Sequence, residues 1–433
     1  MLTTVIIAVT TCTLLILSVL FFPKIRIGKI TIDSYWPICL LGAVVIVLAG
    51  SISLREIWLG LTNDSAVNPL KILVLFISMT FLSVFLDELG FFKYLAVWAT
   101  KKAKSGQRSL FLLLYFLVSV LTVFTSNDIV ILTFTPFICY FAKHTKINPI
   151  PYLVAEFAGA NTWSMMLIIG NPTNVYLATT AGIDFISYLK VMFLPTLFAG
   201  AVELCILLLL FRKSLKAPLQ IEITQERLQD KKGVAVGIIH LCVCLLLLII
   251  SAYVDIEMWL ICLLCALSLL VCAGVLSLVK KEKPTAVIHT AKRLPWTLIP
   301  FVLSMFVLVL ALDKQEVTNV LSKTLGEENV VFTYGFSSFL TCNLMNNIPM
   351  SVLFSVIPNM PTPLLTTQAV YASIIGSNIG AFLTPIGALA GIMFTGLIAK
   401  QNVKYGFLDF MKYGVIIALP TLTASLFGLW IVL

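Results

Sequence analysis

Four clusters of polar residues interrupt this otherwise apolar sequence, and each lies near the middle of an apolar segment. Their Asn, Ser and Thr side chains supply neutral hydrogen-bond donors and acceptors. Their Gly and Pro residues open a helix and expose backbone carbonyls, so half-helix ends aim partial charges into the space between them. Groups of this kind bind a small solute or an ion. The clusters are Ser126-Asn127-Asp128, Gly170-Asn171-Pro172-Thr173-Asn174, Asn346-Asn347-Ile348-Pro349, and the stretch from Gly376-Ser377-Asn378 to Thr384-Pro385-Ile386-Gly387.

Asp128 adds the one negative charge to these clusters. A carboxylate near the centre of a bilayer is costly, which makes it a functional candidate by default. It can coordinate Na⁺ together with Asn127, or take up a proton. The alternative is that Asp128 only caps the helix that begins at Ile129. Capping and binding are compatible, and we favour a role in binding.

Two more acidic residues lie within apolar segments. Glu156 comes just before the second cluster, and Glu203 lies deep in the following segment. Each is a candidate for a proton relay, and each is equally consistent with a protonated or paired structural group.

The composition places these clusters in a membrane. The chain has 433 residues, of which 60% are hydrophobic and 11% are charged, whereas a soluble domain carries about 25% charged residues. The hydrophobic residues come in blocks of about twenty, which is the length that crosses the hydrocarbon core. The net charge of +9 falls mostly in short loops, so topology explains it better than nucleic-acid binding does.

Little in the sequence suggests an enzyme, a metal centre or a cofactor. The chain contains three histidines and no phosphate-cradling glycine loop. Cys262 and Cys265 have C-x-x-C spacing, but no second pair or histidine lies near them in the sequence. We interpret the ten cysteines as small buried hydrophobic residues and predict neither a disulfide framework nor a metal site.

The apolar blocks predict an all-α polytopic membrane protein of about ten transmembrane helices and two re-entrant hairpins. The hairpins are expected at 109–142 and 329–357, because each of these segments has a polar break with arms too short to span comfortably. Irregular backbone at that depth is tolerated only where protein or a water-filled cavity satisfies it. The expected spans are 2–22, 35–50, 69–87, 149–180, 187–211, 233–252, 258–279, 294–312, 368–399 and 406–432.

The distribution of charge orients the chain, since basic loops stay in the cytoplasm. With both termini outside, Arg55, Lys314 and Lys323 are the exceptions among the basic residues. Lys143 and Lys146 fall inside only if 109–142 is a hairpin. The acidic residues expected outside are Glu56, Asp64, Asp255, Glu257, Glu316, Glu327 and Glu328. The basic residues expected inside include Lys24, Arg26, Lys29, Lys101, Lys102, Lys104, Arg108, Arg212, Lys213, Lys216, Lys231, Lys232, Lys280, Lys281, Lys283, Lys292, Arg293, Lys400 and Lys404.

This topology predicts two repeats of opposite orientation, at 1–211 and 233–433, joined by a cytoplasmic linker at 212–232. Each repeat has a hairpin and then a broken helix, at 149–180 in the first and 368–399 in the second. Gly159-Ala160-Asn161 followed by Gly170 echoes Gly376-Ser377-Asn378 followed by Gly387, with the same spacing. Inverted repeats with discontinuous helices are typical of secondary transporters. The amphipathic segment 91–102 is expected to lie in the membrane interface.

Several motifs resemble the ion transporter superfamily, which includes arsenite permeases, the melanosomal P protein, citrate carriers and divalent-anion/sodium symporters. They are Phe85-Leu86-Asp87-Glu88-Leu89-Gly90-Phe91-Phe92, Asn127-Asp128 with Thr135-Pro136, and the three later clusters. Dicarboxylate symporters usually have Ser-Asn-Thr at both tips, and this chain departs from that pattern at both. Asn-Asp paired with Asn-Asn-Ile-Pro is more similar to the arsenite-permease and P-protein branch.

The resemblance implies a mobile unit, formed by hairpins and broken helices, that slides as an elevator along a scaffold that is often dimeric. We therefore expect a multi-pass cell-membrane carrier that exports arsenite, antimonite or a related oxyacid against an H⁺ or Na⁺ gradient. The alternatives are a citrate, dicarboxylate or other anion carrier coupled to H⁺ or Na⁺, and an ion channel. The residues expected to bind substrate or ion, around one cavity near the midplane, are Ser126, Asn127, Asp128, Asn161, Gly170, Asn171, Thr173, Asn174, Asn346, Asn347, Asn378 and Thr384.

Overall fold

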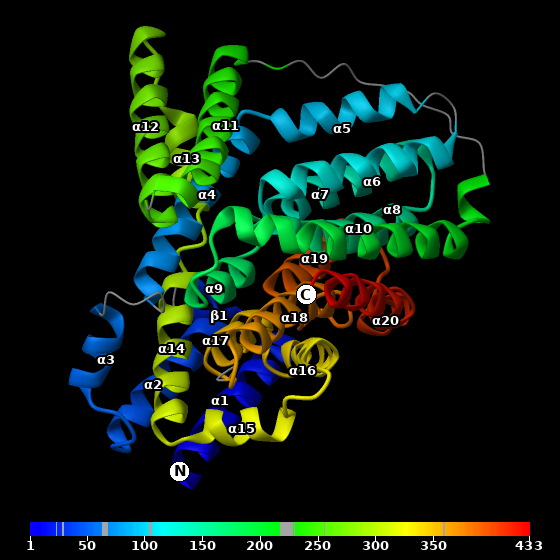
Figure 1. Ribbon diagram of the computed structural model, residues 1–433. Coiled ribbons are helices and arrows are strands. Elements are labelled where there is room, and N and C mark those ends of the chain that lie inside the picture. Colours follow the sequence, from blue (N-terminus) through cyan, green and yellow to red (C-terminus); the bar gives the residue numbers. More distant parts are fainter. Residues whose placement is uncertain are drawn as a thin grey trace.

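The structure is a computed structural model that describes residues 1–22, 24–27, 30–62, 68–103, 106–216, 228, 230–254, 256–357 and 360–433. Lys29, Asp64, Lys104 and Asp255, which helped to orient the chain, lie outside the described residues, as does most of the expected linker 212–232. The described chain is built almost entirely of helices (Figure 1). The prediction of an all-α polytopic membrane protein is confirmed.

The first half contains one strand pair where a plain loop was expected. Strands β1 (Lys24–Ile27) and β2 (Ile30–Asp33) form an antiparallel ribbon. The helices of this half are α1 (Leu2–Phe21), α2 (Tyr35–Leu48), α3 (Leu54–Thr62), α4 (Pro69–Glu88), α5 (Phe91–Lys102), α6 (Gln107–Phe124), α7 (Asn127–Thr145), α8 (Ile150–Trp163), α9 (Pro172–Thr180) and α10 (Phe185–Leu210), with short 3₁₀ turns η1 (Ser164–Met166), η2 (Ile168–Gly170) and η3 (Ser214–Lys216).

The second half is also helical. Its helices are α11 (Lys231–Val254), α12 (Met258–Val279), α13 (Thr285–Arg293), α14 (Leu298–Lys314), α15 (Val317–Leu325), α16 (Val330–Met345), α17 (Asn347–Val356), α18 (Pro363–Gly380), α19 (Leu389–Lys400) and α20 (Phe407–Val432). In Figure 1, α11 and α12 project together beside α4 and α13, whereas α16, α18 and α20 gather on the opposite side of the molecule.

Eight helical segments in the described parts of the chain are long and apolar enough to cross a membrane. They coincide with expected spans or, for 107–124, with the first arm of an expected hairpin. The expected span 294–312 begins late, at Leu298. The backbone of Leu294 is extended before Pro295, because a proline disfavours the helical conformation of the residue before it. That residue separates the short helix α13 from α14.

The two broken helices open at different places from those the sequence indicated. In the first, α8 already ends at Trp163 and two 3₁₀ turns lead to Asn171. In the second, α18 continues through Gly376 and ends at Gly380. Gly376 therefore serves packing and does not open the helix, since a Cβ there would lie 2.0 Å from Ser338 Oγ of α16. The absence of a side chain lets the two backbones approach closely.

Ion pairs join charged groups that the charge pattern placed on the same side of the membrane. Lys314 pairs with Glu56 at 2.7 Å, and both were assigned outside. Lys280, assigned inside, pairs with Asp230 of the expected linker at 2.6 Å. These contacts agree with the relative order of the loops.

Candidate functional site

All four polar clusters lie where one helix ends and the next begins. Helices α7, α9 and α17 start at the first three clusters, and α19 starts directly after the fourth. The carboxyl ends of α6, α16 and α18 face the same breaks. Unpaired N–H groups carry partial positive charge at helix starts, and unpaired carbonyls carry partial negative charge at helix ends. The clusters therefore present both kinds of partial charge to a solute.

The first tip joins α6 to α7 through Thr125 and Ser126. Asn127 Nδ2 donates to Asn161 Oδ1 of α8 at 3.0 Å, and Asn127 Oδ1 accepts from Asp128 N at 2.9 Å. The Ser126 hydroxyl is buried and has no hydrogen-bond partner among the described residues. Asp128 is half-buried in the first turn of α7, where a negative charge is favoured.

The first break is held by amide side chains. Asn171 Oδ1 accepts from Thr173 N at 3.2 Å and from the Thr173 hydroxyl at 3.1 Å, which caps α9. Asn174 Nδ2 donates to Ser164 O at 2.9 Å. Gly170 is needed for close approach, since a Cβ there would lie 2.1 Å from Ser164 O. The side chains of Asn171, Thr173 and Asn174 are buried.

The second tip, between α16 and α17, is tied to the backbone of the second break. Asn346 has a φ of +77°, which a non-glycine residue adopts only when its surroundings hold it there. Its Nδ2 donates to Ile386 O at 2.9 Å, and Asn347 N donates to Gly387 O at 2.9 Å. The Thr384 hydroxyl donates to Asn343 Oδ1 of α16 at 2.6 Å.

Asn378 of α18 joins the two halves of the chain. Its Oδ1 accepts from Asn171 Nδ2 at 2.9 Å and from the Ser164 hydroxyl at 3.0 Å. Its Nδ2 donates to Asn174 Oδ1 at 2.6 Å. The two breaks therefore meet in one buried network. Each tip has its own separate contacts, Asn127 with α8 and Asn346 with the second break.

The acidic residues Glu156 and Glu203 are fully buried on neighbouring helices. Both carboxyl oxygens of Glu156 lie 3.0 Å from the Thr135 hydroxyl of α7. The Thr162 hydroxyl of α8 donates to Glu203 Oε2, while Glu203 Oε1 has no hydrogen-bond partner among the described residues. Helix α8 thus carries Glu156 on its contact with α7, and Thr162 on its contact with α10.

Sequence reasoning missed several residues of this network. Ser164 lies in the centre, and its only sequence signal is its position three residues after Asn161. Thr135 had a stronger signal, because it belongs to the Thr-Pro pair that follows the first tip. Asn343 belongs, with Asn346 and Asn347, to the polar break that predicted the hairpin 329–357, although it was not among the expected site residues. Thr162 follows Asn161 without forming part of a recognisable pattern.

Residues 34–376 match the citrate transporter family. The chain belongs to that family. This stretch runs from α2 into α18 and so includes both tips and the first break. The protein is therefore a multi-pass membrane transporter.

Relatives of similar length extend this relationship over nearly the whole chain. The arsenical pump membrane protein of Escherichia coli is 26% identical over 409 residues, which cover 90% of this chain and 91% of that one. The 46 kDa membrane protein of Mycobacterium leprae is 24% identical over 408 residues, covering 90% and 92%.

Two solved structures share the fold. The Alcanivorax borkumensis YdaH transporter has a TM-score of 0.58 at 12% identity and covers 99% of this chain and 98% of its own. Neisseria gonorrhoeae MtrF, described as one of a class of antimetabolite efflux pumps, has a TM-score of 0.52 at 13% identity, with 99% and 94% covered.

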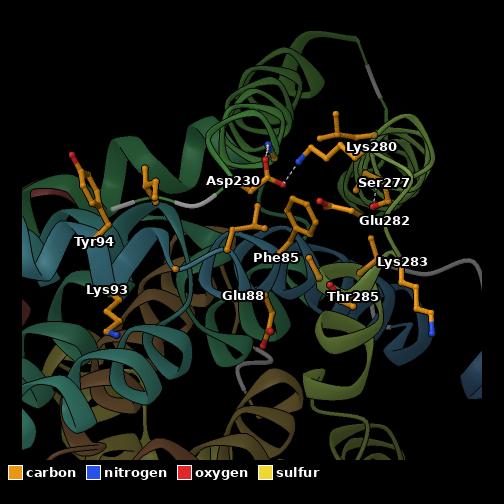
Figure 2. Close-up of a pocket in the computed structure, with 18 residues that line it drawn as sticks. Phe85, Glu88, Lys93, Tyr94, Asp230, Ser277, Lys280, Glu282, Lys283 and Thr285 are labelled. Atoms are coloured by element: carbon orange, nitrogen blue, oxygen red, sulfur yellow. Dashed lines mark hydrogen bonds and ion pairs between the residues drawn. The ribbon is translucent and has the colours of Figure 1, made fainter. Parts of the chain in front are cut away.

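A cavity of about 700 Å³ in this transporter lies away from the polar clusters (Figure 2). It is lined by the end of α4, the start of α5 and the ends of α11, α12 and α13 that lie near them. In Figure 2, Lys280 and Asp230 face one another at its rim. None of the site residues predicted from the sequence lines this cavity.

An ionic contact beside that cavity reaches the first tip helix. Arg293 of α13 donates to Asp87 Oδ2 at 2.7 Å and to Glu88 Oε1 at 2.5 Å, both at the end of α4. Asp87 Oδ1 also accepts from the Thr133 hydroxyl of α7 at 2.7 Å. The Asp-Glu motif of the superfamily thus connects α4 and α13 to the helix that carries Asp128.

Proposed function

We propose that this transporter exports arsenous acid, antimonous acid or a closely related small neutral oxyacid, driven by a gradient of H⁺ or Na⁺. The supporting observation is the chemistry of the four clusters. Their polar side chains are amides and hydroxyls, with the carboxyl group of Asp128 as the only charge. In the described residues, no Lys, Arg or His side chain is hydrogen-bonded to these clusters.

A neutral substrate fits such a site better than a polyanion does. Citrate carries three carboxylates, and burying them near the bilayer centre requires cationic partners or metal ions. A small neutral hydroxide can instead exchange its water hydrogen bonds for bonds to amides, hydroxyls and helix ends. The arsenical pump membrane protein named among the relatives supports the same substrate class.

Coupling is assigned to the acidic groups around the first tip. Asp128 holds a cation or a proton in the first turn of α7, with Asn127 as the neighbouring ligand. Glu156 of α8, which faces α7, and Glu203 of α10, which faces α8, relay protons if H⁺ is the coupling ion. In this proposal the halves 1–211 and 233–433 are inverted repeats, and the tips and breaks move together as an elevator against the remaining spans of a homodimer.

A second candidate is a citrate or other anion carrier coupled to H⁺ or Na⁺. The description of the matching family favours it. This function requires bound cations to neutralise the substrate, because the clusters contain no basic side chain.

A thermal-shift screen of the purified protein separates the two candidates. A ligand that binds only the folded state raises its apparent stability by mass action. We expect stabilisation by arsenite and antimonite and none by citrate, succinate or sulfate, with or without Na⁺. Stabilisation by citrate alone would overturn the oxyacid assignment in favour of the second candidate.

Flux in reconstituted vesicles tests the carrier mechanism. A carrier saturates with substrate and accumulates it when an ion gradient is imposed. A channel passes substrate only down its own gradient and carries current. Arsenite flux that never exceeds equilibrium under an imposed pH or Na⁺ gradient would exclude secondary active transport.

A further inference from the structure

Three cysteines and a methionine meet between α4, α11 and α12, away from the polar clusters. Cys244 Sγ of α11 lies 3.9 Å from Cys262 Sγ of α12 and 3.6 Å from Met79 Sδ of α4. Cys265 lies one turn further along α12. All four side chains are buried.

The sequence alone gave a different interpretation of these thiols. The C-x-x-C spacing of Cys262 and Cys265 was attributed to coincidence, because no further ligand lies near them in the sequence. The structure supplies that ligand from α11, since Cys244 faces the pair across the helix contact. The chain's remaining seven cysteines are also free. Cys242 and Cys272, on the same two helices, are exposed.

Simple packing is the competing explanation, because a buried cysteine behaves as a small hydrophobic residue. Packing alone does not require sulfur beside sulfur. Thiolates and thioethers are soft ligands that select soft ions. Two sulfurs bonded at about 2.3 Å to one central atom lie at most about 4.6 Å apart, and the Cys244–Cys262 distance of 3.9 Å is within that limit.

The apolar surroundings limit which ions or atoms can bind to these thiols. In the described parts of the chain, no three His, Cys, Asp or Glu side chains already surround a point where a metal ion would fit, so the thiols must rotate to bind. Three thiolates around Zn²⁺ or Cu⁺ would leave a net negative charge buried among apolar helices, which is costly. Trivalent arsenic bonded to three thiols is neutral.

We propose that Cys244, Cys262 and Cys265 form a second site, in the α4–α11–α12 contact, that binds trivalent arsenic or antimony covalently. Each thiol forms a sulfur–arsenic bond and replaces one hydroxyl of arsenous acid. The thiol proton leaves with that hydroxyl as water, so three waters are released and no oxidant is needed. The bound atom links α11 covalently to α12 beside Met79 of α4. Met79 lies about two turns before Asp87, the α4 residue that contacts Thr133 of the first tip helix α7.

The test uses the purified, fully reduced protein in detergent, with arsenite as the probe and Cu⁺ and Zn²⁺ as parallel arms. Bound arsenic is measured after gel filtration, and its neighbours are identified by X-ray absorption. We expect one tightly held arsenic per chain, surrounded by sulfur and not oxygen. Cys244→Ala and Cys262→Ala should each weaken binding more than about a hundredfold, since even groups outside the ligand shell contribute about 10- to 100-fold.

Cys242→Ala and Cys272→Ala are matched controls on the same helices, and both should bind arsenic as wild type does. Cys244→Ser is a second variant in case the alanine variant does not fold. The proposal is overturned if no sulfur-ligated arsenic is found, if Cys244→Ala and Cys244→Ser bind normally, or if Cu⁺ or Zn²⁺ displaces arsenic at equal concentration.

This site and the proposed transport function can fail separately. If arsenite no longer stabilises the Cys244→Ala variant against unfolding but arsenite flux continues, the stabilisation came from the thiol site alone. Loss of flux in wild-type protein that still binds sulfur-ligated arsenic reports on the transport proposal alone. The thermal-shift screen for substrate is therefore best repeated in Cys244→Ala, where a remaining arsenite effect belongs to the polar clusters.

Discussion

The first tip is held by a side chain and the second by the backbone. Asn127 donates to the amide oxygen of Asn161 in α8. This tip also has a carboxylate, Asp128, and the Ser126 hydroxyl, which has no hydrogen-bond partner in the described part of the chain. Asn346 instead adopts a φ of +77° and bonds to Ile386 O of the second break. The second tip has no charged residue.

This difference suggests that the two tips have different roles in transport. A tip fixed by backbone bonds and a strained residue is pre-organised, and it offers mainly dipoles to a substrate. A tip with an unsatisfied hydroxyl and a carboxylate has unused ligands for a cation or proton. The comparison predicts that a change of charge at the first tip alters the coupling of transport to the ion gradient. A change that adds volume beside the backbone should instead destabilise the protein wherever the breaks are tightly packed.

The largest effect is expected for Asp128→Asn. α7 begins at Asn127 with Ser126 at its N-cap position, so Asp128 lies in the first turn and is not the cap of a helix beginning at Ile129. The variant keeps the shape of this side chain but removes the charge and the titration. We expect it to abolish gradient-driven accumulation of substrate while folding and membrane insertion remain intact. Transport is measured in vesicles under an imposed pH gradient and then an imposed Na⁺ gradient.

Asp184→Asn is the matched control, because Asp184 caps α10 through Ile186 N and Ser187 N at 2.9 and 3.0 Å. It should leave coupling unchanged. If Asp128→Asn retained wild-type coupling under both gradients, Asp128 would have only a structural role in the first turn of α7, and the difference between the tips would have no functional meaning.

The next largest effect is expected when the breaks are overpacked. A Cβ at Gly170 would meet backbone Ser164 O at 2.1 Å, and a Cβ at Gly387 would meet backbone Gly380 O at 2.7 Å. Overpacking costs about 1–3 kcal/mol and sometimes more. We expect Gly170→Ala and Gly387→Ala both to lower the unfolding temperature in detergent, with Gly170→Ala the more severe because its neighbour is closer.

Gly274→Ala in α12 is the control, since nothing lies within 4 Å of its added Cβ. Alanine there should be neutral or stabilise the helix by up to about 1 kcal/mol. A first break that tolerated Gly170→Ala would contradict the close packing that brings Ser164, Asn171 and Asn174 together.

A smaller effect is expected for Thr133→Val, which removes the hydroxyl that α7 donates to Asp87 at 2.7 Å. Among the described residues, no side chain of α17 donates a comparable hydrogen bond to a carboxylate. A hydrogen bond to a charged group contributes about 1.5–3 kcal/mol, and Asp87 keeps its bond to Arg293. We therefore expect the maximal transport rate to change several-fold, with the apparent affinity for substrate preserved.

Thr145→Val is a control on the same helix, because the Thr145 hydroxyl donates within its own helix, to Phe141 O at 2.8 Å. Equal rates in both variants would show that the contact between α4 and the first tip helix has no role in the transport cycle.

Much of the fold followed from the sequence, because a bilayer permits few solutions for an apolar chain. The spans at 69–87 and 258–279 agree with α4 and α12 to within one residue. The site residues around the two breaks were also recognisable, since Asn, Gly and Pro rarely cluster inside apolar blocks. The positions at which the helices open were less predictable. Gly376 could not be identified as a packing residue without knowing that α16 lies against it.

The contacts that bring distant segments together were beyond sequence reasoning. Cys244 precedes Cys262 by eighteen residues, and only the antiparallel packing of α11 on α12 places them together. Asn378 likewise meets Asn171 and Ser164 through tertiary packing. Residue types predicted the chemistry available at these places, but helix packing determines which of the groups share one site.

Asp230, just before the first residue of α11, is a carboxylate outside both tips with which the first tip can be compared. Lys280 Nζ lies 2.6 Å from Asp230 Oδ2, and Gly233 N donates to Asp230 Oδ1 at 2.9 Å. Partial burial acts to raise the pKa of Asp230, but the hydrogen bonds from Lys280 and Gly233 and the Lys280 charge outweigh it, so the pKa is lowered.

The smallest effect is expected for Asp230→Asn, which keeps the acceptor for Gly233 N but removes the charge. A carboxyl group whose pKa is lowered by folding stabilises the protein above its ordinary pKa, and that contribution is lost as the pH falls through the folded value. At neutral pH the variant should therefore be less stable by roughly 0.5 kcal/mol, as is typical of partly exposed ion pairs. The difference should shrink in high salt. It should also decline as the pH falls below the ordinary aspartate pKa of about 4 and disappear below the lowered pKa of the folded protein. Unfolding temperatures in detergent at neutral and acidic pH, each at low and high salt, measure it. A stability difference that persisted in acid would mean that Asp230 acts through packing and not through its charge. If Asp230→Asn also changed transport coupling, the distinction between the first tip and the rest of the molecule would be lost.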